Sequence, residues 1–341
     1  MRNARQPADH DAEPTPRRDF LRQATTLAAT LTTALPALQA NASTLRPSPD
    51  APDQNFDLDT SILSENREPR IHTLVLHYTA TPLAQALDIL TNPKRGVSAH
   101  YVVPDTAQSG GRFTVYQLVP ESELAHHAGV SAWLGERLIN GTSIGMEIVN
   151  IGFGPEDNRR PLMDRRWYAY PDSQIDVVCQ LAATIVQRHG IAPNRVVGHA
   201  DVAPGRKLDP GPLFPWQRLH ERGIGAWPDA ATVAFYRDHM PYAGDVATVQ
   251  AKLRTYGYDT PQTGQLDQAT TNVIESFQMH FCASHRYDGV PDAQTVAVLD
   301  ALLEKYLDVP RPSADVTAKS RSAATGPNAP DDAASAIYRH P

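Results

Sequence analysis

The sequence predicts an α/β protein, in which helices flank a central mixed β-sheet, followed by a smaller domain of three helices. Three observations favour this class. Apolar, β-branched runs typical of buried strands alternate with helical patterns within residues 62–228. Three helical patterns follow one another within residues 245–307. The 341 residues, of which 41% are apolar, suffice for two folded units with tails.

The overall composition excludes several classes of partner. The formal net charge is -7 and the isoelectric point is about 6.0, so no global basic surface is available for nucleic acid or an anionic membrane. We therefore expect no nucleic-acid partner, and we expect a monomer. Cys179 and Cys282 are the only cysteines, which excludes a disulfide framework and a cysteine zinc site. Cys179 falls inside a helical pattern and is expected to be a small core residue.

The first forty residues are expected to be an export signal. The pair Arg17-Arg18 precedes Phe20-Leu21, and an uncharged run extends from residue 23 to residue 40. That run is too short and too weakly apolar for a stable membrane span. The paired arginines resemble a twin-arginine signal, and the alternative is an ordinary basic amino-terminal region. Residues 41–61 form a polar lead-in, so the mature chain would begin near residue 41, lack a transmembrane segment and work outside the cytoplasm.

Residues 62–228 are expected to form the first folded unit. Apolar, β-branched runs predict strands at residues 70–77, 97–103, 113–118, 143–149 and 195–199. Gly110-Gly111 should turn the chain between the second and third of these runs, which makes them a hairpin.

Two helices are expected between these strands. Their patterns cover residues 82–90 and 173–189. Thr81 is expected to cap the first helix. Ser173 and Asp176 are expected to form a capping box for the second, and Gly190 is expected to end it.

The stretch from Val196 to Pro212 is the most informative part of the chain. A short strand leads to His199, and a loop rich in proline and glycine then brings Lys207 and Asp209. These prolines and glycines disfavour regular structure and give a stiff, turned backbone. A rigid loop with such side chains at a strand end is more often a functional site than a connector. Imidazole and carboxylate groups are both good zinc ligands.

A third candidate ligand, His77, ends another predicted strand. A lone histidine at a strand end is more often structural than metal-binding. Asp209 follows His199 by ten residues, however, and three ligands from two strand ends and a fixed loop could converge on one ion. Such a set would leave one coordination position for water.

Two charged residues break the local pattern. Glu147 interrupts the apolar run of its strand, where an unpaired carboxylate would be costly to bury. Either Glu147 lies on a solvated face, or it is a general base beside the metal site. Lys207 is either a surface charge or a group that stabilises a developing oxyanion.

Five motifs of the first unit resemble those of a known enzyme family. They are His77-Tyr78-Thr79-Ala80, Ser98-Ala99-His100-Tyr101, His127-Ala128-Gly129, Ser143-Ile144-Gly145-Met146-Glu147 and Gly198-His199-Ala200-Asp201 through Lys207-Leu208-Asp209-Pro210-Gly211. Residues 62–228 resemble the zinc N-acetylmuramoyl-L-alanine amidases of the AmpD and AmiD type, which are relatives of the peptidoglycan-recognition proteins. His126 departs from the family pattern, in which a bulky aromatic or a small residue precedes the matching histidine.

The resemblance implies a fold, an activity and a set of site residues. The fold would be the amidase or peptidoglycan-recognition fold, and the substrate would be peptidoglycan or muropeptides. One zinc ion per chain would be bound by His77, His199 and Asp209. Glu147 would be the catalytic carboxylate and Lys207 would assist it, so that the amide bond between N-acetylmuramic acid and L-alanine is hydrolysed in cell-wall turnover. Together with the export signal, this implies a periplasmic or cell-wall-associated enzyme.

The second unit follows a linker, expected at residues 229–244. Helices are predicted after residue 245, with Asp267 and Asp292 as N-caps of the second and third. Residues 245–307 resemble the three-helix peptidoglycan-binding domain, on Leu253 to Tyr258, Phe277-Gln278 and Tyr287 to Val290. The alternative is a stabilising appendage without a binding role. Residues 308–341 are rich in Ala, Pro, Ser and Asp and are expected to be disordered.

Two other functions remain open from the sequence. The first unit could be a recognition module that holds muropeptides without cutting them, although such modules usually lack a metal ligand. It could also be a zinc peptidase that cuts within the stem peptide. Zinc analysis and a hydrolysis assay distinguish the amidase from a recognition module. The masses of the products distinguish it from a zinc peptidase.

Overall fold

The structure is a computed structural model and describes residues 59–108 and 110–312 of the 341-residue chain. The chain divides after Ser64, and the helices and strands described below all belong to the unit that begins at Glu65. The expected export signal, nearly all of the lead-in and most of the tail lie outside the described residues. No helix within the described ranges is both long enough and apolar enough to cross a membrane.

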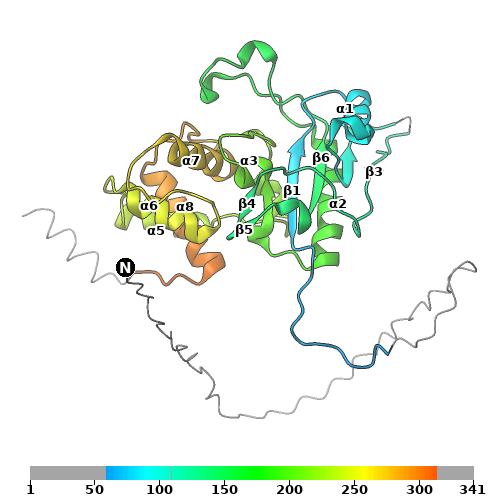
Figure 1. Ribbon diagram of the computed structural model, residues 1–341. Coiled ribbons are helices and arrows are strands. Elements are labelled where there is room, and N and C mark those ends of the chain that lie inside the picture. Colours follow the sequence, from blue (N-terminus) through cyan, green and yellow to red (C-terminus); the bar gives the residue numbers. More distant parts are fainter. Residues whose placement is uncertain (1–58, 109, 313–341) are drawn as a thin grey trace, which may run out of the picture. The chain divides into compact units, whose positions relative to one another are not determined.

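A five-stranded mixed sheet lies at the centre of this unit, as the sequence predicts (Figure 1). Its strands are β1 (Thr73–Tyr78), β2 (Tyr101–Val103), β3 (Tyr116–Gln117), β6 (Ser143–Ile148) and β7 (Val196–Gly198). The order across the sheet is β3-β2-β6-β1-β7. β3 pairs antiparallel with β2, which confirms the predicted hairpin, and all other pairs are parallel. A separate hairpin of β4 (Ala132–Trp133) and β5 (Glu136–Arg137) was not predicted, because such short strands carry no periodicity.

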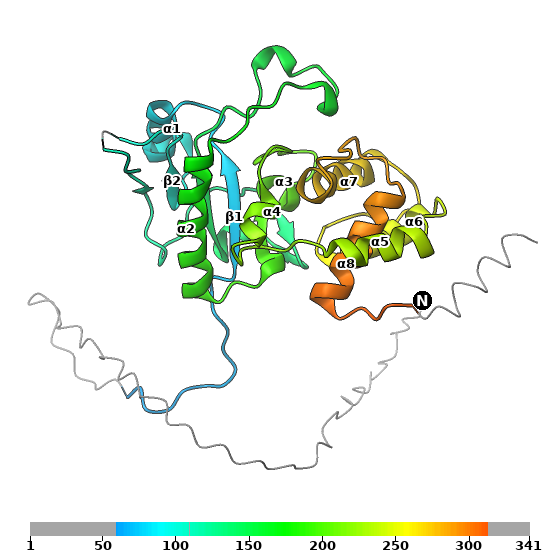
Figure 2. The same ribbon diagram turned by 180° about the vertical axis from the view of Figure 1, so that it is seen from behind.

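One face of the sheet is covered by α2, which spans Asp172–His189 (Figure 2). Alternate strand residues and one stripe of α2 form a buried core. It includes Leu74, Leu76, Ile144, Met146, Ile148, Val178, Cys179, Ala182 and Ile185. Gly190 ends the helix in a left-handed conformation, with φ 65°, as predicted.

The predicted capping box of α2 is wrong. The N-cap is Pro171, which makes no side-chain cap, and the helix therefore begins before Ser173. Asp176 forms ion pairs with Arg218 at 2.7 Å and Arg222 at 2.6 Å instead. The carboxylate thus ties the first turns of α2 to a neighbouring segment.

Short helical segments occupy the connections. α1 spans Leu83–Thr91 and has Pro82 at its N-cap, so Thr81 is not the cap that the sequence predicted. α4 spans Trp216–His220. Single 3-10 turns lie at Pro93–Arg95, Ile139–Gly141, Pro155–Asp157, Leu162–Asp164 and Pro193–Arg195. The stretch expected to lack regular structure contains the one-turn helix α3, His199–Val202, because Pro204 follows only after this turn is complete.

Four helices form the carboxy-terminal part: α5 (Ala230–His239), α6 (Val246–Tyr256), α7 (Gln268–Phe281) and α8 (Ala293–Leu307). The predicted caps of α7 and α8 are confirmed, since Asp267 and Asp292 each accept a backbone N–H of the first turn at 2.8 Å. α5 lies within the segment expected to be a linker. It packs against α8, where the Tyr236 hydroxyl donates to Glu304 at 2.9 Å.

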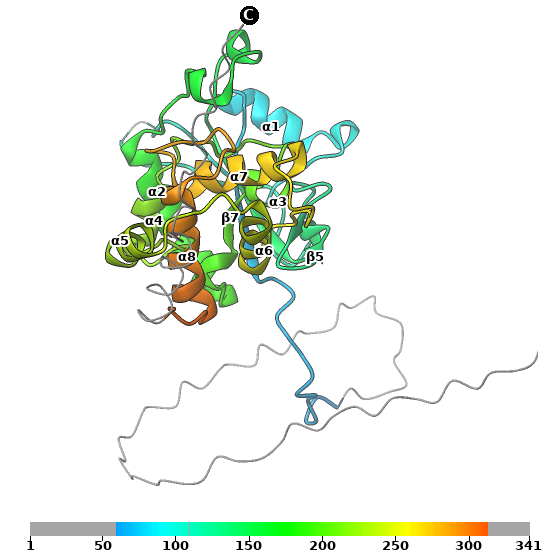
Figure 3. The ribbon, with the colours of Figure 1, turned by 90° about the vertical axis from the view of Figure 1, so that its left-hand side faces the viewer.

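A single apolar core joins the second face of the sheet to these helices. Val75 of β1, Val197 of β7 and Val202 of α3 belong to the same buried cluster as residues of α6, α7 and α8. The Trp133 ring meets the Tyr258 ring edge to face, with 4.9 Å between centroids. α3 lies beside α7 in each view (Figures 1, 2 and 3). The helices after residue 229 therefore pack directly on the part of the chain that carries His199.

Candidate active site

The candidate residues gather at the carboxyl ends of three parallel strands. His77 of β1 and Glu147 of β6 are register partners, so their side chains emerge side by side on the same face. β7 ends at Gly198, and His199 follows directly as the first residue of α3. Ligand sites of parallel sheets lie at this edge, where the strands end and the loops begin.

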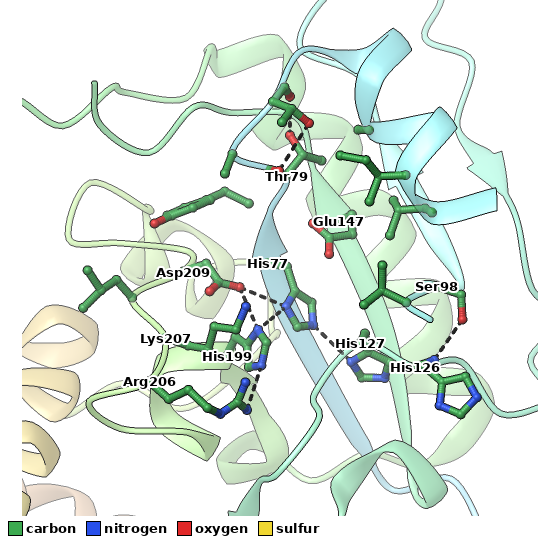
Figure 4. A pocket seen from close by; sticks show the side chains of 18 residues that line it. His77, Thr79, Ser98, His126, His127, Glu147, His199, Arg206, Lys207 and Asp209 are labelled. Atoms are coloured by element: carbon green, nitrogen blue, oxygen red, sulfur yellow. Dashed lines mark hydrogen bonds and ion pairs between the residues drawn. The ribbon is translucent and has the colours of Figure 1, made fainter. Parts of the chain in front are cut away.

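The structure brings His77, His199 and Asp209 into contact (Figure 4). The two Nδ1 atoms of the histidines are 2.9 Å apart, and Asp209 Oδ2 lies 2.9 Å from Nδ1 of His77 and 3.1 Å from that of His199. All three side chains are buried. Ligands about 2.0–2.2 Å from a tetrahedral zinc ion are separated by about 3.3–3.6 Å, so this cluster is close to the required size.

The protonation pattern of the two histidines also fits a cation. His199 Nε2 lies 3.1 Å from the carbonyl oxygen of Ala128, which can only accept, so Nε2 carries the proton and Nδ1 has a free lone pair. His77 presents its Nδ1 to the same point. Two lone pairs and a carboxylate oxygen that face one another at this distance repel unless a positive charge lies between them. The donor set is thus suited to a zinc ion.

Burial and charge bias these groups toward their metal-binding forms. Burial, and after it the charge of the neighbouring His199, lower the pKa of His77 to about 4. Burial alone would raise the pKa of Asp209, but the neighbouring His199 and His77 outweigh it and hold that pKa well below its ordinary value. A neutral imidazole and an ionised carboxylate are the forms that bind metal.

His127 fixes the orientation of His77. The Ser143 hydroxyl donates to the carbonyl of Ile139 at 2.7 Å, so it accepts from His127 Nε2, 3.1 Å away. His127 Nδ1 is then free to accept from His77 Nε2–H at 3.1 Å. A side chain at Gly145 would overlap the His127 ring, so His127 can occupy this position only because residue 145 is glycine. The sequence motif contained His127, but no positioning role was predicted for it.

Glu147 lies beside the three candidate ligands rather than on a solvated face. It lines a cavity of about 390 Å³ together with His77, His199 and Asp209. Within residues 59–312, its buried Oε2 has no hydrogen-bond partner. Burial raises the pKa of the Glu147 carboxyl well above its ordinary value, Asp209 raises it further, and Lys207 opposes the shift. A half-buried carboxylate with such a raised pKa is suited to accept a proton at neutral pH.

Two cations line the same cavity with different contacts. Lys207 points toward the cluster in Figure 4 and faces the cavity. Arg206, which the sequence did not single out, donates to the carbonyls of Ala128 and Val130 at 2.5 and 2.7 Å. Arg206 therefore ties the loop after α3 to the segment that bonds His199 Nε2. Tyr78 and His126 also line the cavity, and one wall is apolar, made by Ala86, Ile89, Leu90 and Val97.

Two family models match the sequence. The model described as N-acetylmuramoyl-L-alanine amidase matches residues 67–212, which include all five candidate site residues. A model for peptidoglycan binding domains matches residues 242–299.

Individual relatives extend over both parts. The N-acetylmuramoyl-L-alanine amidase AmiD of Escherichia coli is 43% identical over 258 residues, which are 74% of this chain and 90% of that protein. The structure of AmiD with the substrate anhydro-N-acetylmuramic acid-L-Ala-D-gamma-Glu-L-Lys superposes with a TM-score of 0.67, covering 74% of this chain and 96% of that one. AmpDh3 of Pseudomonas aeruginosa, in complex with anhydromuramic pentapeptide, is 38% identical, with a TM-score of 0.65 and coverage of 74% and 98%.

Proposed function

The chain belongs to the N-acetylmuramoyl-L-alanine amidase family, and from this premise we propose that His77, His199 and Asp209 hold the zinc ion of the enzyme. The observation that carries the proposal is the convergence of two imidazole Nδ1 atoms and one carboxylate oxygen, all buried. Beside them lies Glu147, whose buried Oε2 has no hydrogen-bond partner in the described part of the chain. When bound, zinc polarises the substrate carbonyl and lowers the pKa of a coordinated water to about 7. These three ligands would leave one position of a four-coordinate ion for water or substrate.

Glu147 is proposed as the group that moves the proton. Its carboxylate accepts a proton from the attacking water and returns it to the departing amide nitrogen, so that the nitrogen leaves as an amine. The raised pKa supports both steps, because it brings the carboxyl closer to neutral pH. Lys207 is proposed to offset the negative charge that develops on the carbonyl oxygen.

The proposed substrates are muropeptides that contain the bond from the lactyl group of N-acetylmuramic acid to L-alanine. The anhydromuramyl ligands of AmiD and AmpDh3 support this choice. The apolar wall beside the cluster offers a surface for the carbon skeleton of such a ligand. We propose that residues 242–299 bind peptidoglycan and raise the local concentration of the enzyme at the wall.

Product masses test the proposal directly. Purified full-length chain is incubated with soluble anhydro-muropeptides, with and without a zinc chelator. The expected products are free anhydro-N-acetylmuramic acid and a complete stem peptide that begins with L-alanine, and the chelator should abolish them. Cleavage within the stem peptide would identify a peptidase instead, and zinc binding without cleavage would identify a recognition module.

We further propose an exported enzyme that acts in the periplasm or at the cell wall, by the twin-arginine route and as a monomer. The cell-wall substrates of its relatives support the location, and the paired arginines before Phe20 support the route. Amino-terminal sequencing of the secreted protein should give a start near residue 41. A start at residue 1 in material from the cytoplasm would contradict export.

The change His127→Ala removes the acceptor for His77 Nε2–H, so we expect the dissociation constant for zinc to rise about 10–100-fold, as is typical of partners behind a metal ligand. His127→Asn should lose less, because its amide oxygen can stand in for Nδ1. Chelator competition measures both. His126→Ala, which alters an exposed neighbour, is the control and should bind zinc as tightly as the unmodified chain.

A further inference from the structure

Asp201 is a buried carboxylate that the proposed reaction does not use. It lies two residues after His199 in the one-turn helix α3, and only 1% of its surface is exposed. Its Oδ2 accepts the backbone N–H of Gly198 at 2.7 Å, which stabilises the turn from which His199 projects. A carboxylate buried to this degree requires further donors for its oxygens.

The further donors come from the carboxy-terminal helices. The Tyr258 hydroxyl, just beyond α6, donates to Asp201 Oδ1 at 2.5 Å. His280 of α7 donates from Nδ1 to Asp201 Oδ2 at 2.7 Å. Both residues lie within the 242–299 segment that matches peptidoglycan binding domains. The first turn after β7 is therefore held by side chains that are 57 and 79 positions away in the sequence.

The position of His280 is itself fixed by packing. Its ring stacks on Trp216 of α4, with 3.7 Å between centroids and 16° between planes, and on Phe281, at 3.8 Å and 8°. In the part of the chain that the structure describes, His280 Nε2 is buried and has no partner. The proton therefore lies on Nδ1, where it is donated to Asp201.

A second contact presses α7 against the same loop. Gly205 lies between His199 and Asp209, and a side chain at this position would overlap the side chain of Asn272 of α7. Its φ of 73° also favours glycine. Val202 joins the apolar core that α6, α7 and α8 share. The carboxy-terminal helices thus contact this loop through a polar cluster, a close backbone approach and a common core.

We infer that the carboxy-terminal helices position the loop from His199 to Asp209, through the hydrogen bonds of Tyr258 and His280 to Asp201. Tyr258, His280 and Asp201 are positioning residues, because they act on the site through the backbone that carries His199. The inference rests on the proposed ligand role of His199 and Asp209. If the helices position this loop, they contribute to the hydrolysis of soluble muropeptides as well. Binding of the enzyme to the cell wall cannot explain such a contribution.

Two tyrosine variants of the full-length chain separate positioning from general stabilisation. Tyr258→Phe removes only the hydroxyl that reaches Asp201. Tyr236→Phe removes a hydroxyl of the same kind, donated to Glu304 between α5 and α8, away from α3. Both tyrosines are buried. Thermal unfolding, zinc affinity by chelator competition, kcat and KM on soluble muropeptides, and amide hydrogen exchange of zinc-free protein are measured for each variant.

We expect both variants to melt at slightly lower temperatures, by similar amounts. Only Tyr258→Phe should weaken zinc binding and lower kcat, each by about threefold to tenfold. This is at or below the loss of about 10–100-fold that is typical when a residue hydrogen-bonded to a metal ligand is changed. The KM of Tyr258→Phe should be unchanged, and only in this variant should the amides of residues 198–211 exchange faster. Asp201→Asn should show a larger effect of the same kind, because its amide group would face donors.

Equal zinc affinity, kcat and exchange in Tyr258→Phe, Tyr236→Phe and the unmodified chain would overturn the inference. So would losses of the same size in both variants, since these would reflect general stability. An unmodified chain that binds no zinc and cleaves no muropeptide would instead refute the proposed function, which the inference needs. The two failures are therefore distinguishable by the behaviour of the unmodified chain.

Discussion

Glu147→Gln should lower kcat on soluble muropeptides by about 10²–10⁴-fold, the usual contribution of a positioned general base. The amide has nearly the shape of the carboxylate but cannot take a proton from water. Glu147 Oε2 has no hydrogen-bond partner among the residues of the described ranges, so the change breaks no bond that holds the fold. It also removes a carboxylate whose ionised form is disfavoured by burial. Steady-state kinetics and thermal unfolding measure the two effects.

The decisive comparison for Glu147 is between turnover and zinc content. We expect the Gln variant to keep one zinc per chain and a melting temperature at least equal to that of the unmodified protein. Turnover close to normal in such a zinc-loaded variant would remove Glu147 from the mechanism. Loss of zinc together with turnover would make Glu147 part of the metal site rather than the base.

His199→Ala should abolish zinc binding and reduce turnover by more than about 10³-fold. This loss is larger than the roughly 10–100-fold loss expected when a residue that hydrogen-bonds a metal ligand is changed. His77 and Asp209 alone would leave two protein ligands, one fewer than a catalytic zinc site uses. Metal analysis of the purified protein by mass spectrometry gives the zinc content. Added zinc should not restore activity at concentrations that saturate the unmodified chain.

Stability needs a separate control in this experiment, because His199 is buried and bonds the Ala128 carbonyl. His239→Ala alters an exposed histidine of α5 and should keep full zinc content. Circular dichroism of both variants establishes that each is folded. A folded His199→Ala protein with one zinc per chain would show that the ligand set is wrong.

The elements predicted correctly from sequence are those with a strong local signal. β1 and β6 are apolar runs that pair over their whole length. Asp267 and Asp292 are followed by helical patterns and cap α7 and α8. The sequence suggested that His77, His199 and Asp209 could meet, since two strand ends and a fixed loop carry them, and the family resemblance implied the same set; the structure brings them together.

The features that were missed depend on contacts between distant residues. Asp176 favours a capping box locally, yet Arg218 and Arg222 attract its carboxylate in the fold. α5 has a weak pattern of its own, and its packing on α8 makes it a helix where a linker was expected. The roles of His127 and Asp201 follow from hydrogen-bond partners that no spacing in the sequence reveals.

The proposed mechanism depends on one zinc ion bound among His77, His199 and Asp209. Anomalous diffraction at the zinc absorption edge, from crystals of the active full-length protein, tests it most directly. We expect a single strong peak about 2.0–2.2 Å from Nδ1 of His77, Nδ1 of His199 and an oxygen of Asp209. A peak held by other residues, or no peak at this cluster in crystals that still cleave muropeptides, would contradict it.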